Sequence, residues 1–323
     1  MQAIIHERFG PPSDVLTIED VDTPQPGRGE VLVQVRATAV AKGDWLVAHG
    51  YPYIARPAYG IRTPKHRIAG LETSGVVEAV GADVTDFQKG DEVFGWTKAG
   101  SLAEFVAIPA DHLVHKPGGI TFEQAAAVPV SGFAALQAVR DAGGVDAGMD
   151  VLVIGASGGV GSFAVQIAKA LGAEVTGVAS TSNVGFVGEL GADHVIDYTQ
   201  ESITGSGRRF DVIIDIAGNN SISTLRSALA GRGTAVIVGG SGGKVTMGFG
   251  RTLRSMLVSP FVPQRLKAVL SKPNQEDLKV LAGLVESGEL IPRVEATYPL
   301  AQAAQAIELV GAGKSRGKTV VTI

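Results

Sequence analysis

The segment from Gly155 to Gly161 has the residue types and spacing of a loop that binds phosphate. It follows an apolar strand candidate at residues 151–154 and precedes an amphipathic helix candidate at residues 162–171. Glycines let the backbone approach a pyrophosphate, and a helix start offers free N–H donors and the positive end of its dipole. The combination predicts a dinucleotide-binding turn, with contacts from Ser157, Gly158, Gly159, Val160 and Gly161.

The end of the next strand candidate, residues 174–179, is where such a fold holds the adenosine ribose, about 20 residues beyond the turn. The sequence places Ser180, Thr181 and Asn183 there, with no acidic residue before Glu189. A carboxylate would bond the 2′-hydroxyl of NAD and repel the 2′-phosphate of NADP, whereas hydroxyls and an amide can donate to phosphate. The sequence therefore favours NADP, although residues 180–188 contain no Lys or Arg.

Two other kinds of motif have simpler interpretations. Residues 155–159 and 239–243 match the Gly-x-Ser-x-Gly elbow of serine hydrolases, but the last histidine, His194, precedes most candidate acids. His112 and His115 have a spacing that could suggest a metal, yet the chain has no cysteine to join them. We therefore predict neither a serine hydrolase nor a metal site.

Composition excludes several classes of function. The 323 residues include no cysteine, which rules out disulfides, thiolate nucleophiles, iron–sulfur clusters and Cys-rich zinc sites. The 28 Lys and Arg against 32 Asp and Glu give a net charge of −4 without runs of like charge, which argues against nucleic-acid and anionic-membrane partners. The first residues carry Glu7 and Arg8 and lack the apolar core of a signal peptide, so we expect a cytoplasmic protein.

The pattern of apolar residues changes near residue 122. Before it, short apolar runs broken by Gly, Pro and Asp predict antiparallel strands. After it, helical patterns alternate with strand candidates, which predicts a doubly wound parallel sheet. The strand candidates are residues 151–154, 174–179, 194–197, 211–216 and 234–238.

Beyond residue 262 the sequence predicts helices at 276–286 and 300–310 and a last strand at 318–323. We expect these elements to return to the first domain. The predicted α/β chain thus has one domain from residues 1–121 and 263–323 and a cofactor domain from residues 122–262.

Nearly the whole chain resembles the medium-chain dehydrogenase/reductase superfamily, in its zinc-independent quinone oxidoreductase branch, which includes zeta-crystallin. The resemblance rests on residues 70–81, 87–95, 125–136 and 190–198, together with the glycine turn. It implies a GroES-like β-barrel catalytic domain, a doubly wound Rossmann domain for the cofactor, and NADPH as the hydride source. The predicted cofactor site also includes Tyr198, Gly218 and Gly239.

Zinc-dependent alcohol dehydrogenases of this superfamily carry a Gly-His-Glu motif whose histidine binds the metal. Here that position is Leu71, and the cysteine ligand usual near Asp44 is absent, so the resemblance implies chemistry without zinc. Three positions depart from the branch. Residues 41–44 replace an Asn-Pro-x-Asp motif, Ala134 replaces a threonine, and Asn183 replaces a lysine that often holds the 2′-phosphate.

A quinone or α,β-unsaturated carbonyl can accept hydride from nicotinamide without a metal, because the charge spreads onto an oxygen that needs only hydrogen-bond donors. We expect residues 42–66 to border the substrate cleft, with Tyr53 as proton donor and Lys42 as second choice. Water could instead supply the proton, and both side chains would then be ordinary loop residues.

Two other functions stay open. A 2-enoyl thioester reductase would need a basic groove for coenzyme A phosphates, which Arg56, Arg62, Lys65 and Arg67 could form. A non-catalytic NADPH-binding protein, structural or regulatory, would bind the cofactor without oxidising it for any of these substrates. The apolar run at residues 256–262 could pair sheet edges in a homodimer, as the resemblance suggests, or form an internal strand.

Overall fold

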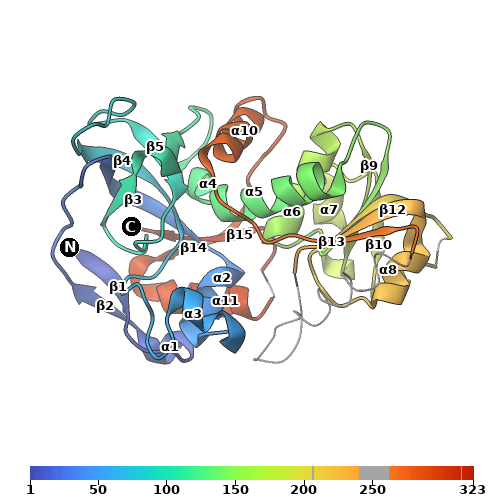
Figure 1. Ribbon diagram of the computed structural model, residues 1–323, viewed down its shortest axis with the longest axis horizontal. Helices are drawn as coiled ribbons and strands as arrows, with labels where there is room; N and C mark the ends of the chain where they lie inside the picture. Colours follow the sequence, from blue (N-terminus) through green and yellow to red (C-terminus); the bar gives the residue numbers. More distant parts are fainter. Residues whose placement is uncertain (206, 240–261, 314) are drawn as a thin grey trace. The chain divides into compact units, whose positions relative to one another are not determined.

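The computed structural model describes residues 1–205, 207–239, 262–313 and 315–323 (Figure 1). The chain forms two compact units. Unit 1 contains Met1–Ser131, Pro273–Gly288 and Pro292–Ile323, and unit 2 contains Gly132–Lys272 and Glu289–Ile291. The C-terminal segment from Pro273 onward therefore returns, apart from Glu289–Ile291, to the unit that the N-terminal segment begins.

Unit 2 is built on a six-stranded sheet in which every described pairing is parallel. Numbered along the chain, its strands lie in the order 3-2-1-4-5-6, which is the order of doubly wound dinucleotide folds. From edge to edge they are β10 (His194–Asp197), β9 (Glu174–Ala179), β8 (Asp150–Ile154), β11 (Phe210–Asp215), β12 (Leu229–Ile237) and β13 (Arg265–Ala268).

The strands of unit 2 are apolar because helices cover the sheet and leave little of it in contact with water. Leu152, Phe210 and Ile213 are fully buried and belong to one core cluster. The longest helix among the described residues of unit 2, α6 (Gly159–Ala170), packs on β8 and β9. The shorter helices are α7 (Val184–Glu189) and α8 (Ile222–Ala228), and a π-helical turn spans Gln137–Gly143.

The predicted doubly wound α/β fold is confirmed. β9 and β10 have the predicted bounds, β8 begins one residue earlier than predicted, and β11 both begins and ends one residue earlier. β12 begins earlier than predicted, at Leu229, and β13 was missed. β13 reads Arg-Leu-Lys-Ala, which has no apolar run to mark it, and it forms because an edge of the parallel sheet accepts its backbone.

Unit 1 is mainly antiparallel, and its seven-stranded sheet carries the GroES-like part of the chain. The path runs through β14 (Val294–Pro299), β15 (Lys318–Thr322), β3 (Glu30–Val40), β4 (Glu72–Val80), β5 (Glu92–Trp96) and β7 (Leu113–His115), with β6 (Phe105–Pro109) paired to β3. β1 (Gln2–His6) and β2 (Leu16–Asp20) form a separate hairpin. Alternating residues of β3, Val31, Val33 and Val35, point into one apolar core with Val77 and Val93.

The helices of unit 1 include two that pack together, α2 (Lys42–His49) and α11 (Ala303–Gly311). The predicted helix at 300–310 opens with a 3-10 turn, Leu300–Gln302, before α11 begins. The remaining helices are α1 (Pro12–Val15), α3 (Arg56–Tyr59) after the 3-10 turn Tyr53–Ala55, α4 (Phe122–Ala126) and α10 (Gln275–Glu286), and α5 (Pro129–Leu136) runs from unit 1 into unit 2.

The two units divide after Ser131 and Lys272, later than the changes of sequence pattern near residues 121 and 262. The helix α4 explains the first difference, because its Ala126 packs with Ala37 and Ala39 of β3. β13 explains the second, because it extends the sheet of unit 2 beyond residue 262.

Two sequence expectations concern surfaces. Among the described residues, no helix has both the length and the hydropathy needed to cross a bilayer. The apolar run proposed as a dimer edge, residues 256–262, lies outside the described residues except for Val262, which packs on the core cluster of unit 2.

Candidate cofactor edge and substrate pocket

The glycine turn of unit 2 follows the central strand β8 and leads directly into α6. Gly155 has φ of 85°, a left-handed conformation that side chains disfavour. A methyl group on Gly161 would come within 2.0 Å of the carbonyl oxygen of Gly155. These two glycines therefore allow the tight turn and the close packing of helix on strand that the sequence predicted.

The N-terminus of α6 carries unused hydrogen-bond donors. Gly158 is the N-cap, and no side chain caps the helix there. The N–H groups of Gly159, Val160 and Gly161 form the first turn, where an α-helix provides no acceptor. With the positive end of the helix dipole, they form a surface suited to an anion.

The neighbouring strands β8 and β11 end at the same edge of the sheet, where the strand order reverses. Beyond β11, the N–H of Gly218 donates to the buried carboxylate of Asp215 across 3.0 Å. Beyond β12, a methyl group on Gly239 would lie 2.1 Å from the carbonyl oxygen of Ile216. The structure thus brings Gly218 and Gly239 to the edge that carries the glycine turn.

The segment after β9 is a 3-10 turn, Thr181–Asn183. The side-chain amide of Asn183 donates to the hydroxyl of Ser180 across 3.2 Å and to that of Ser157 across 3.4 Å. The backbone N–H of Tyr198 donates to Ala179, and the tyrosine side chain is exposed. All four predicted ribose or phosphate contacts, Ser180, Thr181, Asn183 and Tyr198, therefore gather at one corner of unit 2.

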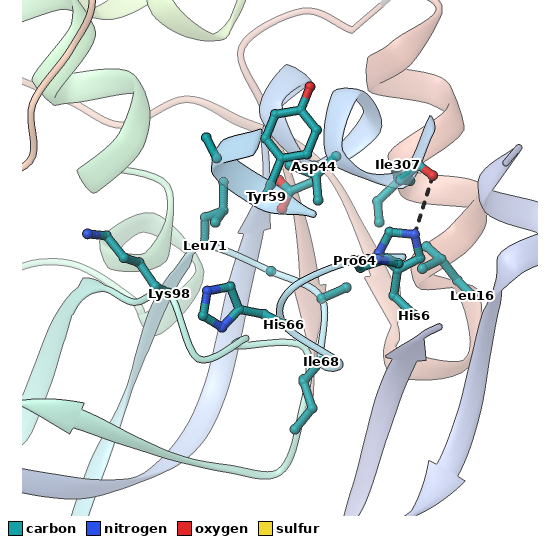
Figure 2. Close-up of a pocket in the computed structure, with 15 residues that line it drawn as sticks. His6, Leu16, Asp44, Tyr59, Pro64, His66, Ile68, Leu71, Lys98 and Ile307 are labelled. Carbon is teal, nitrogen blue, oxygen red and sulfur yellow. Dashed lines mark hydrogen bonds between the residues drawn. The ribbon is translucent and has the colours of Figure 1, made fainter. Parts of the chain in front are cut away.

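Unit 1 contains a mainly apolar pocket of about 190 Å³ (Figure 2). His66 and Lys98 lie on the side opposite His6 and Leu16. The apolar wall includes Leu16, Val47, Ala48, Ala58, Pro64, Ile68, Ala69, Leu71 and Ile307, and the polar side chains are His6, Asp44, Tyr59, His66 and Lys98. An apolar pocket with a few polar groups is typical of a small-molecule site.

Unit 1 also contains a buried charge cluster, which consists of Asp44, Glu72 and Lys318. The ammonium of Lys318 donates to Glu72 Oε1 across 2.5 Å and to Ser131 Oγ across 3.1 Å. The other oxygen of Glu72 accepts the N–H of Val130 across 2.8 Å. Burial raises the pKa of Glu72 to about 7, although Lys318 opposes that shift.

Asp44 belongs both to this cluster and to the pocket wall. Its Oδ2 accepts the N–H of Ala41 across 2.7 Å and so helps to cap α2. Burial raises the pKa of Asp44 to about 6, while the bond from Ala41 and the charge of Lys318 oppose the shift. Two buried carboxylates share one ammonium, so one of them holds its proton more tightly than an exposed carboxyl does.

Two family models match the chain. The description "Alcohol dehydrogenase GroES-like domain" covers residues 27–118, and "Zinc-binding dehydrogenase" covers residues 190–321. The quinone oxidoreductase of Lama guanicoe is 35% identical over 100% of this chain and 98% of its own length. This chain belongs to the medium-chain dehydrogenase/reductase superfamily, as a quinone oxidoreductase-type member.

Other similar proteins agree with this membership. The mitochondrial NAD(P)H oxidoreductase RTN4IP1 of Mus musculus is 33% identical over 91% of this chain and 82% of its own length. The solved structure of the quinone oxidoreductase from Coxiella burnetii has a TM-score of 0.87 and 30% identity, with 100% of this chain and 99% of that chain covered. The resemblance inferred from the motifs is confirmed.

The zinc position of the superfamily is apolar in this dehydrogenase/reductase. Leu71, which the resemblance aligns with the zinc-binding histidine, lines the pocket wall. Among the residues that the structure describes, no three His, Asp or Glu side chains form a group able to hold a metal ion.

The two predicted proton donors do not line the pocket of this dehydrogenase/reductase. The Lys42 ammonium donates to the carbonyl of Gly311 and lies 4.3 Å from the ring centre of Trp45. The ring of Tyr53 packs beneath the guanidinium of Arg56 at 4.6 Å. Both roles stay predictions.

Asp197, at the end of β10, was not among the predicted site residues. The hydroxyl of Thr181 donates to it across 2.6 Å, so a carboxylate stands beside the expected phosphate contacts. This contact joins β9 and β10, whose adjacency follows from the strand order of a doubly wound fold rather than from the residue pattern of either strand. A parallel order with β9 beside β10 would have revealed it, because neighbouring parallel strands end at the same edge.

Proposed function

We propose that this dehydrogenase/reductase transfers hydride from a reduced nicotinamide dinucleotide to a small quinone or α,β-unsaturated carbonyl. The observation that carries the proposal is the uncapped glycine turn after the central strand of a 3-2-1-4-5-6 sheet. NADPH is the hydride donor that the sequence favours.

The cofactor edge fits a dinucleotide in shape and in hydrogen-bonding groups. The N–H groups of Gly159, Val160 and Gly161 would hold the pyrophosphate at the start of α6. Gly158 leaves room for it, because the position carries no side chain. When bound, the dinucleotide supplies the hydride, and the protein binds and orients it.

The pocket of unit 1 fits the hydride acceptor. Its size, about 190 Å³, is that of a cavity for one six-membered ring, since an apolar cavity of about 150 Å³ holds benzene. Its apolar wall, including Leu71 and Ile68, suits a quinone ring or the carbon chain of an enone. The acceptor would therefore enter as a small, mostly apolar molecule.

Polar groups of the pocket wall would assist the acceptor oxygen as it gains negative charge. His66 and Lys98 are exposed side chains that face the pocket, and both can donate hydrogen bonds. The hydroxyl of Tyr59 instead donates to backbone carbonyls, one of them Pro52 at 3.0 Å. We propose that His66 and Lys98 donate to the oxygen, and that the proton arrives there after the hydride.

A 2-enoyl thioester remains the second candidate substrate. The structure gives it limited support, because two of the four predicted basic side chains bind other groups of the protein. Arg56 donates to the carbonyl of Gly50, and Arg67 pairs with Glu7 and Glu19. Fewer guanidinium groups are therefore available for coenzyme A phosphates than the sequence suggested.

The test is steady-state oxidation of NADPH and NADH with a panel of quinones, enones and enoyl thioesters. Turnover with single-ring quinones or short enones supports the proposal. Turnover with thioesters alone would favour the second candidate. Cofactor binding without oxidation by any acceptor would favour a structural or regulatory protein, and failure to bind either dinucleotide would refute all three.

A further inference from the structure

The carboxylate of Asp197 lies next to the segment expected to meet the adenosine ribose. β9 and β10 are parallel neighbours, and Asp197 is in register with Ala179, the last residue of β9. Ser180 and Thr181 follow Ala179 directly. The acid that the sequence lacks at the end of β9 is therefore supplied by the adjoining strand.

Four hydrogen bonds hold this carboxylate in its charged form. Its Oδ2 accepts from the Thr181 hydroxyl at 2.6 Å and from the Gln200 amide at 2.9 Å. Its Oδ1 accepts from the Thr199 hydroxyl at 2.7 Å and from the Thr199 backbone N–H at 3.0 Å. The bond from Thr181, with the others, lowers the pKa of Asp197. The group is therefore a fixed negative charge at neutral pH.

This arrangement uses the donors that the sequence assigned to a phosphate. A threonine hydroxyl has one hydrogen, and the partners of the Thr181 hydroxyl are the Asp197 carboxylate at 2.6 Å and the Thr199 hydroxyl at 2.8 Å. The two amide hydrogens of Asn183 point to the hydroxyls of Ser180 and Ser157. The Thr181 hydroxyl therefore has no hydrogen left to donate to a ligand, and it can only accept a hydrogen bond from one. A ribose 2′-hydroxyl can donate to it, whereas a 2′-phosphate, which is an acceptor at neutral pH, cannot.

The cations paired beside β9 and β10 lie at the amino ends of these strands, whereas Asp197 lies at the carboxyl end of β10. Lys169 bonds Asp193, which precedes β10, and Arg208 bonds Glu174, the first residue of β9. Residues 180–188 contain no Lys or Arg. A phosphate dianion at the turn after β9 would thus meet a carboxylate with no cation from this segment, an arrangement that like charges disfavour.

We propose that Asp197, acting through the hydroxyl of Thr181, makes unit 2 select NADH over NADPH. The inference rests on the proposed function, since it concerns the ribose end of the same dinucleotide. This selectivity is the reverse of the preference for NADPH that the sequence suggested. The reason is that the hydroxyl of Thr181 and the amide of Asn183 donate to other groups of the protein.

The test is equilibrium binding of NADH and NADPH, followed by the fluorescence of the reduced nicotinamide and needing no substrate. The wild-type protein should bind NADH at least about fivefold more tightly. Asp197→Asn removes the charge, and its amide can donate to Thr181 and turn that hydroxyl outward. We expect it to shift the ratio of the two dissociation constants at least about tenfold towards NADPH.

Glu174→Gln is the matched control, because it removes one carboxylate charge at the opposite end of β9. Its ratio should stay within about twofold of the wild type. Equal or tighter binding of NADPH by the wild type would overturn the proposal, as would an Asp197→Asn ratio equal to that of the control. Binding of neither dinucleotide would instead refute the proposed function itself. The wild-type comparison decides the matter even if Asp197→Asn does not fold.

Discussion

The glycine turn of unit 2 and the charge cluster of unit 1 place polar groups in opposite ways. The turn achieves its anion-binding surface with backbone alone, through glycines within seven consecutive residues, Gly155–Gly161. The cluster buries three ionisable side chains, Asp44, Glu72 and Lys318, two of which are 246 positions apart. Backbone N–H groups at a helix start bind an anion without the help of particular side chains. A buried charged side chain, in contrast, is stable only while each of its bonding partners is present.

The buried pair should give the largest effect. Glu72→Gln keeps an acceptor for the N–H of Val130 but leaves the ammonium of Lys318, itself 2% exposed, without its carboxylate. Breaking a buried pair this way costs about 3–5 kcal/mol in the free energy of unfolding. Urea unfolding at pH 8 measures the change.

Glu78→Gln is the control for this variant. It makes the same substitution in the same strand, β4, where Glu78 forms an exposed pair with Lys89. An exposed pair contributes about 0–1 kcal/mol, so its loss should be small. If both variants lost the same free energy of unfolding, burial would not make the Glu72–Lys318 pair more important for stability than the Glu78–Lys89 pair.

The glycine turn should show its effect in binding rather than in stability. A methyl group on Gly158 would lie 3.5 Å from the nearest atom, the carbonyl oxygen of Gly155, so Gly158→Ala should fold. The same methyl group would stand where the pyrophosphate approaches the backbone. We expect dinucleotide affinity to fall about tenfold to a hundredfold, or about 1.4–2.7 kcal/mol, by fluorescence titration.

Gly185→Ala, in the helix α7, serves as its partner control. A methyl group there has no neighbour within 4 Å. The variant should bind as the wild type does and unfold at the same or a slightly higher temperature. Unchanged affinity in Gly158→Ala would place the pyrophosphate away from this turn.

The pH dependence of the free energy of unfolding should distinguish Asp44, in the pocket wall of unit 1, from Asp197, at the cofactor edge of unit 2. The pKa of Asp44 is raised to about 6, above the value of about 3.9 in an unfolded chain. The folded state therefore holds an extra proton between these values, and stability is lost as pH rises through about 6. Asp44→Asn should reduce the loss between pH 4 and pH 8 by on the order of 1–3 kcal/mol.

Urea unfolding across that range measures the slope, and Asp197→Asn provides the comparison. Hydrogen bonds lower the pKa of Asp197, so its stabilising effect is present above the unfolded pKa and lost in acid. Its removal should therefore flatten the acid side instead. Identical slopes in the two variants would mean that Asp44 does not retain its proton on folding.

The sequence could predict the parts of the molecule that local pattern determines. The apolar runs of β8, β9 and β10 and the glycine spacing each lie within a few consecutive residues, and the structure has those elements where they were expected. β13 escaped because Arg265 and Lys267 hide its strand pattern. Such a strand is specified by the sheet edge it joins rather than by its own composition.

The side-chain partnerships could not be predicted in the same way. Thr181 meets Asp197 only because β9 and β10 are adjacent, and Glu72 meets Lys318 only because β4 and β15 belong to one sheet. Each pair depends on strand order, which residue spacing does not specify. The consequence is chemical as well as geometric, since Thr181 was predicted as a donor to phosphate and the structure shows its hydrogen directed to a carboxylate.

The smallest effect should come from Tyr53, the first choice of proton donor in the sequence. The ring of Tyr53 lies against Arg56, and Tyr53 does not line the described pocket. His66 does line it. We therefore expect Tyr53→Phe to change kcat by less than about threefold, whereas His66→Ala should lower kcat/KM about tenfold. Both are measured with the quinone that turns over fastest. A tenfold fall in Tyr53→Phe alone would restore the tyrosine as donor and place proton transfer outside this pocket.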